Sequence, residues 1–243
     1  MLPDAEKNKF LEIIPADRYS DQAEVLASYA YDAFVEESQP DAVIFPESTR
    51  EVSEILKLAS EYKIPVTARG AGTSVCGAPV PKHHGIVLCF SKMNRIIETS
   101  VRDRYMIVQP GVVNAEIQNA LAPHGFFYPP DPGSMATATI GGNIAQNAGG
   151  PRCLKYGVTV DYVLGLEVVL ASGKIIRFGS RNVKDVTGYK LTSLFCGSEG
   201  TLGIITEAIL KVQPLPETVK TLLVMFDDLD SCARSVTDII GSG

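Results

Sequence analysis

The sequence of 243 residues contains no tryptophan, only three histidines and only five cysteines. The cysteines are odd in number and no two of them have the CxxC spacing, which argues against a disulfide framework. No group of histidines, cysteines and carboxylates has the spacing of a zinc site, so the sequence predicts no metal. We therefore expect the thiols to be buried structural groups and the imidazoles to lie at the surface.

An excess of positive charge and a long apolar run are also absent. The chain has 28 acidic and 22 basic residues, and this net charge of −6 argues against nucleic acid and an anionic membrane surface as partners. The first residues carry charges where a signal peptide would be apolar. The most apolar stretch, Val163–Ala171, includes Glu167 and is too short to span a bilayer. We expect a cytoplasmic protein without a transmembrane segment, and peripheral attachment to a membrane stays open.

Glycine is concentrated in three short windows. Eleven of the 21 glycines fall within Arg69–Gly77, Gly133–Gly150 and Gly197–Gly203, where an even spread would place about three. Glycine lets the backbone approach a ligand closely and adopt positive φ. The three windows therefore predict three loops that converge on one long ligand that carries phosphate.

Hydrophobic periodicity predicts an α+β fold with two lobes. Residues 1–39 form an N-terminal helical segment with helices at Lys7–Pro15 and Asp21–Ala33. Strands at 42–45 and 65–68 flank a helix that starts with a capping box at Ser48 and Glu51, which gives a small parallel β-α-β lobe. A larger, mainly antiparallel lobe follows, with a helix over Asn114–Pro123 that Asn114 is expected to cap. Its expected strands are 86–90, 95–99, 105–109, 163–170, 174–178 and 204–212.

The last residues predict the start of a further unit. Pro214–Pro216 is an expected linker, and a strand at Thr221–Phe226 should follow it. Asp228 should cap a helix that ends at Ile240 and has one apolar face. Because one strand and one helix cannot cover a core, we expect residues 218–243 to begin a truncated C-terminal domain. The alternative is that they pack on the first domain.

The first glycine window follows a predicted strand with the sequence Arg69-Gly-Ala-Gly-Thr-Ser74. Consecutive backbone N–H groups in such a turn form a concave anion site. The spacing does not match a Rossmann fingerprint, because Pro79 and Pro81 stop a helix from opening there, and no Lys-Ser/Thr follows Gly77 as in a Walker loop. The alternative is an ordinary glycine turn.

The other two windows have small or polar side chains. Pro129–Ser134 is stiff and leads into Thr139–Gly150, where Asn143, Gln146 and Asn147 offer amide groups to a heterocycle. The alternative for this stretch is tight helix packing through small residues. Gly197–Thr206 ends in a strand whose backbone can pair with a purine edge, and its alternative is a simple junction between loop and strand.

Three stretches follow one another in the chain: RGAGTS, then PDPGS with ATIGGNIAQNAGG, then KDVTGYKLTSLFCGSEGTLGIIT. In this order they closely resemble the FAD-binding domain of the vanillyl-alcohol oxidase/p-cresol methylhydroxylase (PCMH) superfamily. Within it the chain is most similar to the glycolate oxidase D-subunit and D-lactate dehydrogenase branch. The resemblance implies a two-lobed PCMH-type domain over residues 40–217 with FAD between the lobes. By position, it implies contacts with the pyrophosphate from Arg69, Gly70, Ala71, Gly72, Thr73 and Ser74. It implies that the flavin and ribityl chain lie against Pro132, Gly133, Ser134 and Thr139. It places the isoalloxazine and pyrophosphate beside Gly142, Asn143, Gln146, Asn147, Ala148 and Gly149. It assigns the adenosine end to Glu199, Gly200, Ile204 and Ile205, and it implies dissociable FAD because Thr73 stands where some relatives attach the flavin through histidine.

The implied reaction is hydride transfer from a 2-hydroxy acid such as glycolate or D-lactate to the flavin, which gives the 2-oxo acid. The electron acceptor stays open among a quinone, a flavoprotein and an iron–sulfur subunit. The resemblance places catalytic residues and any metal in a cap domain after residue 243, so no catalytic residue is expected in this chain. Arg152 and Lys155 are candidates to stabilise charge on the reduced ring, against the favoured interpretation as solvated cations. Two alternatives remain: a transferase like alkylglycerone-phosphate synthase, and a flavin-holding subunit that a partner completes.

Overall fold

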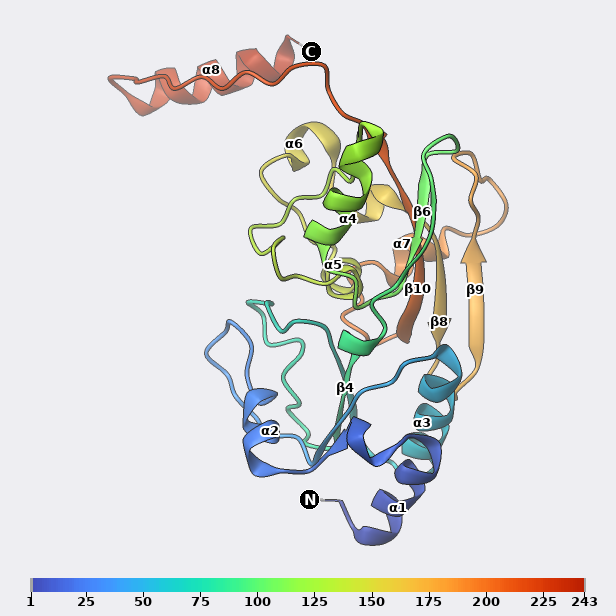
Figure 1. Cartoon of the computed structure of the whole chain (residues 1–243). Coiled ribbons are helices and arrows are strands. Elements are labelled where there is room, and N and C mark those ends of the chain that lie inside the picture. Colours follow the sequence, from blue (N-terminus) through green and yellow to red (C-terminus); the bar gives the residue numbers. More distant parts are fainter. Residues whose placement is uncertain (1, 243) are drawn as a thin grey trace.

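The computed structural model describes residues 2–242 and shows two lobes and a protruding C-terminal segment (Figure 1). The N-terminal lobe holds a four-stranded sheet in the order β1-β2-β4-β3. Its strands are β1 (Tyr19–Ser20), β2 (Ala42–Ile44), β3 (Val66–Arg69) and β4 (Ile86–Cys89). Its helices are α1 (Asp4–Ile13), α2 (Ala23–Ser28) and α3 (Thr49–Glu61), with short 3-10 turns at Ala16–Arg18 and Phe90–Lys92.

The parallel β-α-β unit is present, but its two strands are not neighbours. Both β2 and β3 pair in parallel with β4, which lies between them. The prediction that residues 86–90 belong to the antiparallel lobe is wrong. All four residues of β4 are buried, and such a continuously apolar strand is typical of the centre of a parallel sheet.

The start of α3 confirms half of the predicted capping box. The Ser48 side chain accepts a hydrogen bond from the Glu51 backbone N–H. The Glu51 carboxylate instead accepts two hydrogen bonds from the Arg18 guanidinium, at 2.7 and 2.8 Å, and one from the Glu47 N–H. Arg18 is 7% exposed, so this charged pair joins the N-terminal segment to the sheet lobe.

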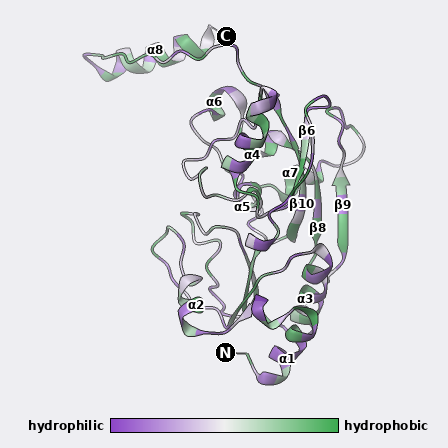
Figure 2. Cartoon of the chain, in the orientation of Figure 1, coloured by the Kyte–Doolittle hydropathy of each residue, from purple (hydrophilic) through white to green (hydrophobic). Residues whose placement is uncertain are grey.

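The second lobe is built on a five-stranded antiparallel sheet in the order β5-β6-β10-β8-β9. Its strands are β5 (Ile96–Ser100), β6 (Tyr105–Val108), β8 (Val163–Val169), β9 (Ile175–Gly179) and β10 (Ile204–Lys211). Helices α4 (Asn114–Leu121), α5 (Ile140–Gln146), α6 (Cys153–Tyr156) and α7 (Leu191–Phe195) belong to the same lobe, with 3-10 turns at Ala122–His124 and Thr159–Tyr162. Figure 2 shows the hydrophobic residues concentrated along β8, β9 and β10. A two-stranded ribbon of β7 (Phe126–Phe127) and β11 (Gln213–Pro214) had not been predicted, and it takes Pro214 out of the expected linker.

Two predicted helix boundaries were wrong for identifiable reasons. The N-cap of α4 is Val113, and Asn114 is a fully buried helical residue whose amide donates to Pro130 O and to Asn143 Oδ1, both at 3.2 Å. The helix predicted over Asp21–Ala33 ends at Ser28. Asp32 accepts a hydrogen bond from the Phe34 N–H at 2.8 Å, a local turn that competes with helix.

The C-terminal segment lies away from both lobes in Figure 1. Thr221–Phe226 was predicted as a strand and has no regular structure, and within residues 2–242 it pairs with no strand. Helix α8 (Leu229–Gly241) follows, and the predicted cap is confirmed because the Asp228 side chain accepts from the Ser231 N–H. Leu223 and Met225 are 95% and 93% exposed, so this apolar segment contributes almost nothing to the core of either lobe.

Candidate cofactor site

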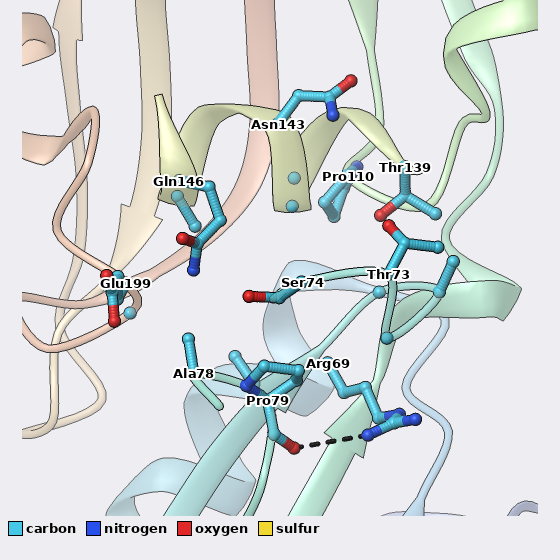
Figure 3. A pocket seen from close by; sticks show the side chains of 18 of the residues that line it. Arg69, Thr73, Ser74, Ala78, Pro79, Pro110, Thr139, Asn143, Gln146 and Glu199 are labelled. Atoms are coloured by element: carbon cyan, nitrogen blue, oxygen red, sulfur yellow. Dashed lines mark hydrogen bonds between the residues drawn. The ribbon is translucent and has the colours of Figure 1, made fainter. Parts of the chain in front are cut away.

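A single cavity of about 260 Å³ collects residues from all three glycine windows (Figure 3). Small-molecule sites typically have volumes of about 300–1,000 Å³. This cavity is slightly smaller, so a dinucleotide would extend beyond its mouth. The residues predicted to contact cofactor line this cavity, with three exceptions: Gly133, Asn147 and Gly149. The convergence of the three windows, inferred from glycine spacing alone, is therefore a feature of the fold.

The three exceptions have other surroundings. Asn147 ends α5 with a φ of 48°, and its Oδ1 accepts from the Val160 N–H at 2.9 Å. At Gly149 a Cβ would lie 3.2 Å from Val158 Cγ1, so this glycine packs against its own lobe. Gly133 is exposed, and a Cβ there would meet nothing within 4 Å.

The loop after β3 forms one wall of the cavity, and the Arg69 side chain lies beneath it. The guanidinium is buried, lies 5.3 Å from the ring centroid of Tyr29 and donates to Pro79 O at 3.4 Å. Figure 3 shows it pointing away from the hydroxyls of Thr73 and Ser74. At Gly72, whose φ is 70°, a Cβ would lie only 2.2 Å from Arg69 Nη2, so any other residue would strain the backbone and displace the guanidinium. Arg69 therefore supports the loop, and the wall that faces a ligand consists of backbone and hydroxyl groups.

Burial lowers the pKa of Arg69 from its usual value, and nearby Asp32 and the Tyr29 hydroxyl act in the opposite direction. An arginine starts so far above neutral pH that it keeps its charge in such a site. A positive charge directly below a glycine loop favours an anion on the upper side, because solvent screens the attraction poorly across the intervening protein.

Thr139 has a buried polar atom without a partner. It precedes α5, it is 7% exposed, and its Oγ1 makes no hydrogen bond to any described residue. The same oxygen would lie 2.0 Å from a Cβ at Gly70, so the hydroxyl and the glycine loop are in close contact. An unsatisfied buried hydroxyl costs about 1–3 kcal/mol, and a polar ligand group in the cavity would remove that cost.

At the other end of the cavity lie α5, the loop after α7 and the thiol of Cys76, which had not been predicted as a site residue. Cys76 is exposed and only Cys89 of the five cysteines is buried, so the expectation of five buried thiols was wrong. Its Sγ lies 3.0 Å from Ser74 Oγ and donates to Gln146 Oε1 at 3.2 Å, with Glu199 Oε1 at 4.0 Å. The backbone N–H of Glu199 donates to Ala145 O at 2.9 Å, and this hydrogen bond fixes the Glu199 backbone against α5.

Several further lining residues had not been predicted. Gly141 and Gly203 belong to the glycine windows, which was a sufficient signal to include them. Phe90 and Pro110 follow β4 and β6 and carry no local signal, because only the tertiary fold brings them to the cavity. The remaining unpredicted lining residues are Ala68, Val75, Cys76, Ala78, Pro79 and Ala145.

Neither candidate cation for the reduced ring lines the cavity. The Arg152 guanidinium pairs with Asp131 at 3.3 Å and lies 5.7 Å from the ring centroid of Phe127. Lys155 is exposed on α6. Both therefore fit the interpretation as solvated cations better. Among residues 2–242 no three histidines, cysteines or carboxylates are grouped as metal ligands would be, and none of the described helices has the length and apolarity needed to cross a bilayer.

The residues present fit a flavin dinucleotide. The glycine wall is open to close backbone approach, the Thr139 hydroxyl lacks a partner, and the amide of Gln146 points toward the cavity (Figure 3). This donor set suits phosphate and ribityl oxygens at one end and a heterocycle at the other.

Comparisons with known proteins agree with this geometry. A glycolate oxidase subunit GlcD from Bacillus subtilis (strain 168) is 50% identical over 237 residues, which cover 97% of this chain and 50% of that protein. A D-lactate dehydrogenase from Anaerostipes hadrus is 40% identical over 230 residues, covering 94% and 48% of the two chains. The chain thus spans about half the length of the curated relatives it matches.

A solved alkyldihydroxyacetonephosphate synthase superposes with a TM-score of 0.79 at 24% identity, over 90% of this chain and 42% of that one. At that identity the likeness shows the fold alone, and it confirms the two-lobed α+β architecture. The model of the FAD binding domain family matches residues 40–179, which hold two of the three glycine windows. The chain belongs to the FAD binding domain family.

Proposed function

We propose that this chain is the cofactor-binding part of an FAD-dependent oxidoreductase that oxidises a 2-hydroxy acid such as glycolate or D-lactate. The observation that carries the proposal is the convergence of three glycine windows on one cavity with an unpartnered, buried Thr139 hydroxyl. Relatives named as glycolate oxidase subunit and D-lactate dehydrogenase support the substrate class. We propose residues 40–217 as the FAD-binding domain.

In this proposal the loop of residues 69–74 holds the pyrophosphate through backbone N–H groups and the Thr73 and Ser74 hydroxyls. Thr139, Pro132 and Ser134 lie along the ribityl and flavin part. The start of β10 and the Glu199–Gly200 turn contact the adenosine end, with Ile205 offering its backbone. These contacts are supported by the shared cavity of the residues concerned.

Attachment of FAD is proposed to be non-covalent. Thr73 stands where some relatives have the histidine that carries flavin, and no histidine is among the residues that line the cavity in residues 2–242. Acid precipitation of the loaded protein tests this, because dissociable flavin stays in the supernatant. Yellow colour in the pellet would contradict the proposal and would point to a nucleophile on the wall such as Cys76.

Bound FAD supplies the acceptor for the hydride that leaves the α-carbon of the substrate. The chain's own residues bind and orient the cofactor, and the apolar side of the cavity, with Phe90, Pro110 and Ile204, keeps water from it. Arg69, the one arginine among the described residues that line the cavity, is turned away beneath the loop. The groups that bind the substrate carboxylate and move its proton are therefore proposed to come from outside this chain.

Exposed apolar side chains in the C-terminal segment support the proposal that the substrate-binding groups come from outside this chain. Leu222 and Leu223 are 84% and 95% exposed, and Ile239 on α8 is 69% exposed. Apolar side chains at this exposure need a covering surface. We propose that residues 218–243 begin a second domain that covers the substrate end of the cavity.

The cellular setting is also a proposal. Some relatives are named as subunits, which supports a partner subunit. We propose that electrons leave the flavin to a quinone, a flavoprotein or an iron–sulfur subunit. We propose a cytoplasmic location, with peripheral attachment to a membrane through that partner. The likeness to the synthase concerns the fold alone, so a transferase function is the weaker candidate.

The decisive experiment uses the protein with its complete C-terminal region, loaded with FAD and kept free of oxygen. Glycolate and D-lactate are expected to bleach the yellow absorbance, whereas the present 243 residues should bind FAD more weakly and turn over poorly. No bleaching with any 2-hydroxy acid would contradict the substrate class. Robust turnover by the 243 residues alone would contradict the division between two domains.

A further inference from the structure

Residues 29–33, which lie before the matched region 40–179, contact the lower side of the cavity loop. The Ala33 N–H donates to Ser74 O at 2.9 Å. The Gly77 N–H donates to Asp32 Oδ2 at 3.0 Å, and the Tyr29 ring lies under the guanidinium of Arg69. The N-terminal segment is thus attached to both the beginning and the end of the glycine loop.

Asp32 is the charged member of these contacts. It is 8% exposed, and its two carboxylate oxygens accept from two backbone N–H groups, Phe34 N–H on its own turn and Gly77 N–H on the loop. Hydrogen bonds from backbone N–H groups to a buried carboxylate are among the stronger ones in proteins. The local turn at Phe34 holds the carboxylate in place, so its second oxygen can fix the loop.

Gly77 is where such a contact has most effect on the loop. Its φ is 75°, and Gly72 has a φ of 70°, so two of the three glycines in residues 70–77 adopt a backbone conformation that other residues avoid. Residues 70–77 belong to no helix or strand. Without anchors, a ligand would have to order this segment as it binds, and that ordering would reduce affinity.

We propose that Asp32 is a positioning residue for the cofactor loop, and that FAD affinity depends on it although Asp32 does not line the cavity. The proposal rests on the FAD binding proposed above. It extends the cofactor site to an N-terminal segment outside the matched region. A protein cut to begin at residue 40 would contain every lining residue and still bind FAD poorly.

The test compares Asp32→Ala and Asp32→Asn with the matched control Asp41→Ala in the 243-residue protein. Asp41 also accepts a hydrogen bond from a glycine N–H, that of Gly85 at 2.9 Å, in the same lobe and away from the cavity. FAD affinity is measured by quenching of flavin fluorescence, thermal unfolding gives stability, and hydrogen–deuterium exchange of residues 70–77 in the cofactor-free protein gives loop order.

Asp32→Ala is expected to raise the FAD dissociation constant about tenfold, which corresponds to about 1.4 kcal/mol, and to speed exchange in residues 70–77. Asp32→Asn keeps one acceptor oxygen but turns an amide donor toward an N–H group, so its affinity should fall between those of wild type and Asp32→Ala. Asp41→Ala should lower thermal stability while it leaves the dissociation constant within about twofold of wild type.

Three outcomes would overturn the proposal: wild-type affinity and loop exchange in Asp32→Ala, an equal loss of affinity in Asp41→Ala, or wild-type affinity in Asp32→Asn when Asp32→Ala does not fold. Its failure is distinguishable from failure of the proposed function. If the wild-type protein itself took up no FAD, the proposed function would be contradicted. If wild type bound FAD and Asp32→Ala bound it equally well, only the role of Asp32 would be lost.

Discussion

The most specific prediction concerns Gly72, which lies on the cavity wall directly above Arg69. Its φ of 70° is in the left-handed region, and a Cβ would lie 2.2 Å from Arg69 Nη2 and 2.6 Å from Cζ. The change Gly72→Ala therefore introduces two separate costs. The backbone must adopt a conformation that L-residues avoid, and the buried guanidinium must move off the lower side of the loop.

The two costs can be estimated separately. A non-glycine residue in the left-handed region costs about 1–2 kcal/mol. Overpacking against a buried side chain adds about 1–3 kcal/mol. The sum, roughly 2–5 kcal/mol, is a large part of the about 5–15 kcal/mol that stabilises a typical domain. If the loop escapes the strain by changing its conformation, FAD must restore it, and affinity should fall about 30-fold or more.

The control is Gly125→Ala. Gly125 has a φ of 71°, but a Cβ there would meet nothing within 4 Å, and it lies outside the cavity. Urea unfolding should show a loss of about 1–2 kcal/mol for Gly125→Ala and a larger loss for Gly72→Ala, with weaker FAD binding in the latter alone. Wild-type FAD affinity in Gly72→Ala, together with a stability no lower than that of Gly125→Ala, would refute the reasoning.

Three further predictions follow from other contacts. Iodoacetamide should alkylate the exposed Cys76 in the cofactor-free protein, and peptide mapping should show protection by FAD; equal labelling in both states would place FAD elsewhere. Thr139→Val should weaken FAD binding about tenfold without loss of thermal stability, because its Oγ1 has no partner among described residues, whereas Thr139→Ser should bind as wild type does. The Arg18 guanidinium holds the pKa of Glu51 below its usual range. This lowered pKa stabilises the fold above the unfolded carboxyl pKa of about 4.3, and the gain is lost as pH falls through the folded pKa. The advantage of wild type over Glu51→Gln in urea unfolding should therefore be complete at pH 7 and shrink in acid, and a pH-independent difference would contradict it.

Local signals were sufficient to predict much of the fold. The Ser48 cap correctly marked the start of α3, and Asp228 likewise marked the start of α8. Glycine spacing alone predicted that the three windows share a ligand, because close backbone approach requires the absence of a Cβ wherever it occurs.

What the sequence could not give depends on contacts between distant residues. The apolar run at residues 86–89 is compatible with the centre of a parallel sheet, but only the tertiary fold shows that it pairs between β2 and β3. The direction of the Arg69 side chain depends on Tyr29 and Pro79, which lie 40 and 10 residues away in sequence. The strand predicted at Thr221–Phe226 is a short apolar run of the kind that forms strands, but β structure needs a partner strand, and residues 2–242 provide none.

The most direct test of the account is hydrogen–deuterium exchange of the 243-residue protein with and without FAD. FAD is expected to slow exchange together in residues 69–77, 139–148 and 199–205, each of which contributes residues to the lining of one cavity, and to leave α8 unchanged. Protection of only one of these segments, or of none under conditions in which flavin is bound, would contradict the claim that they form a single site.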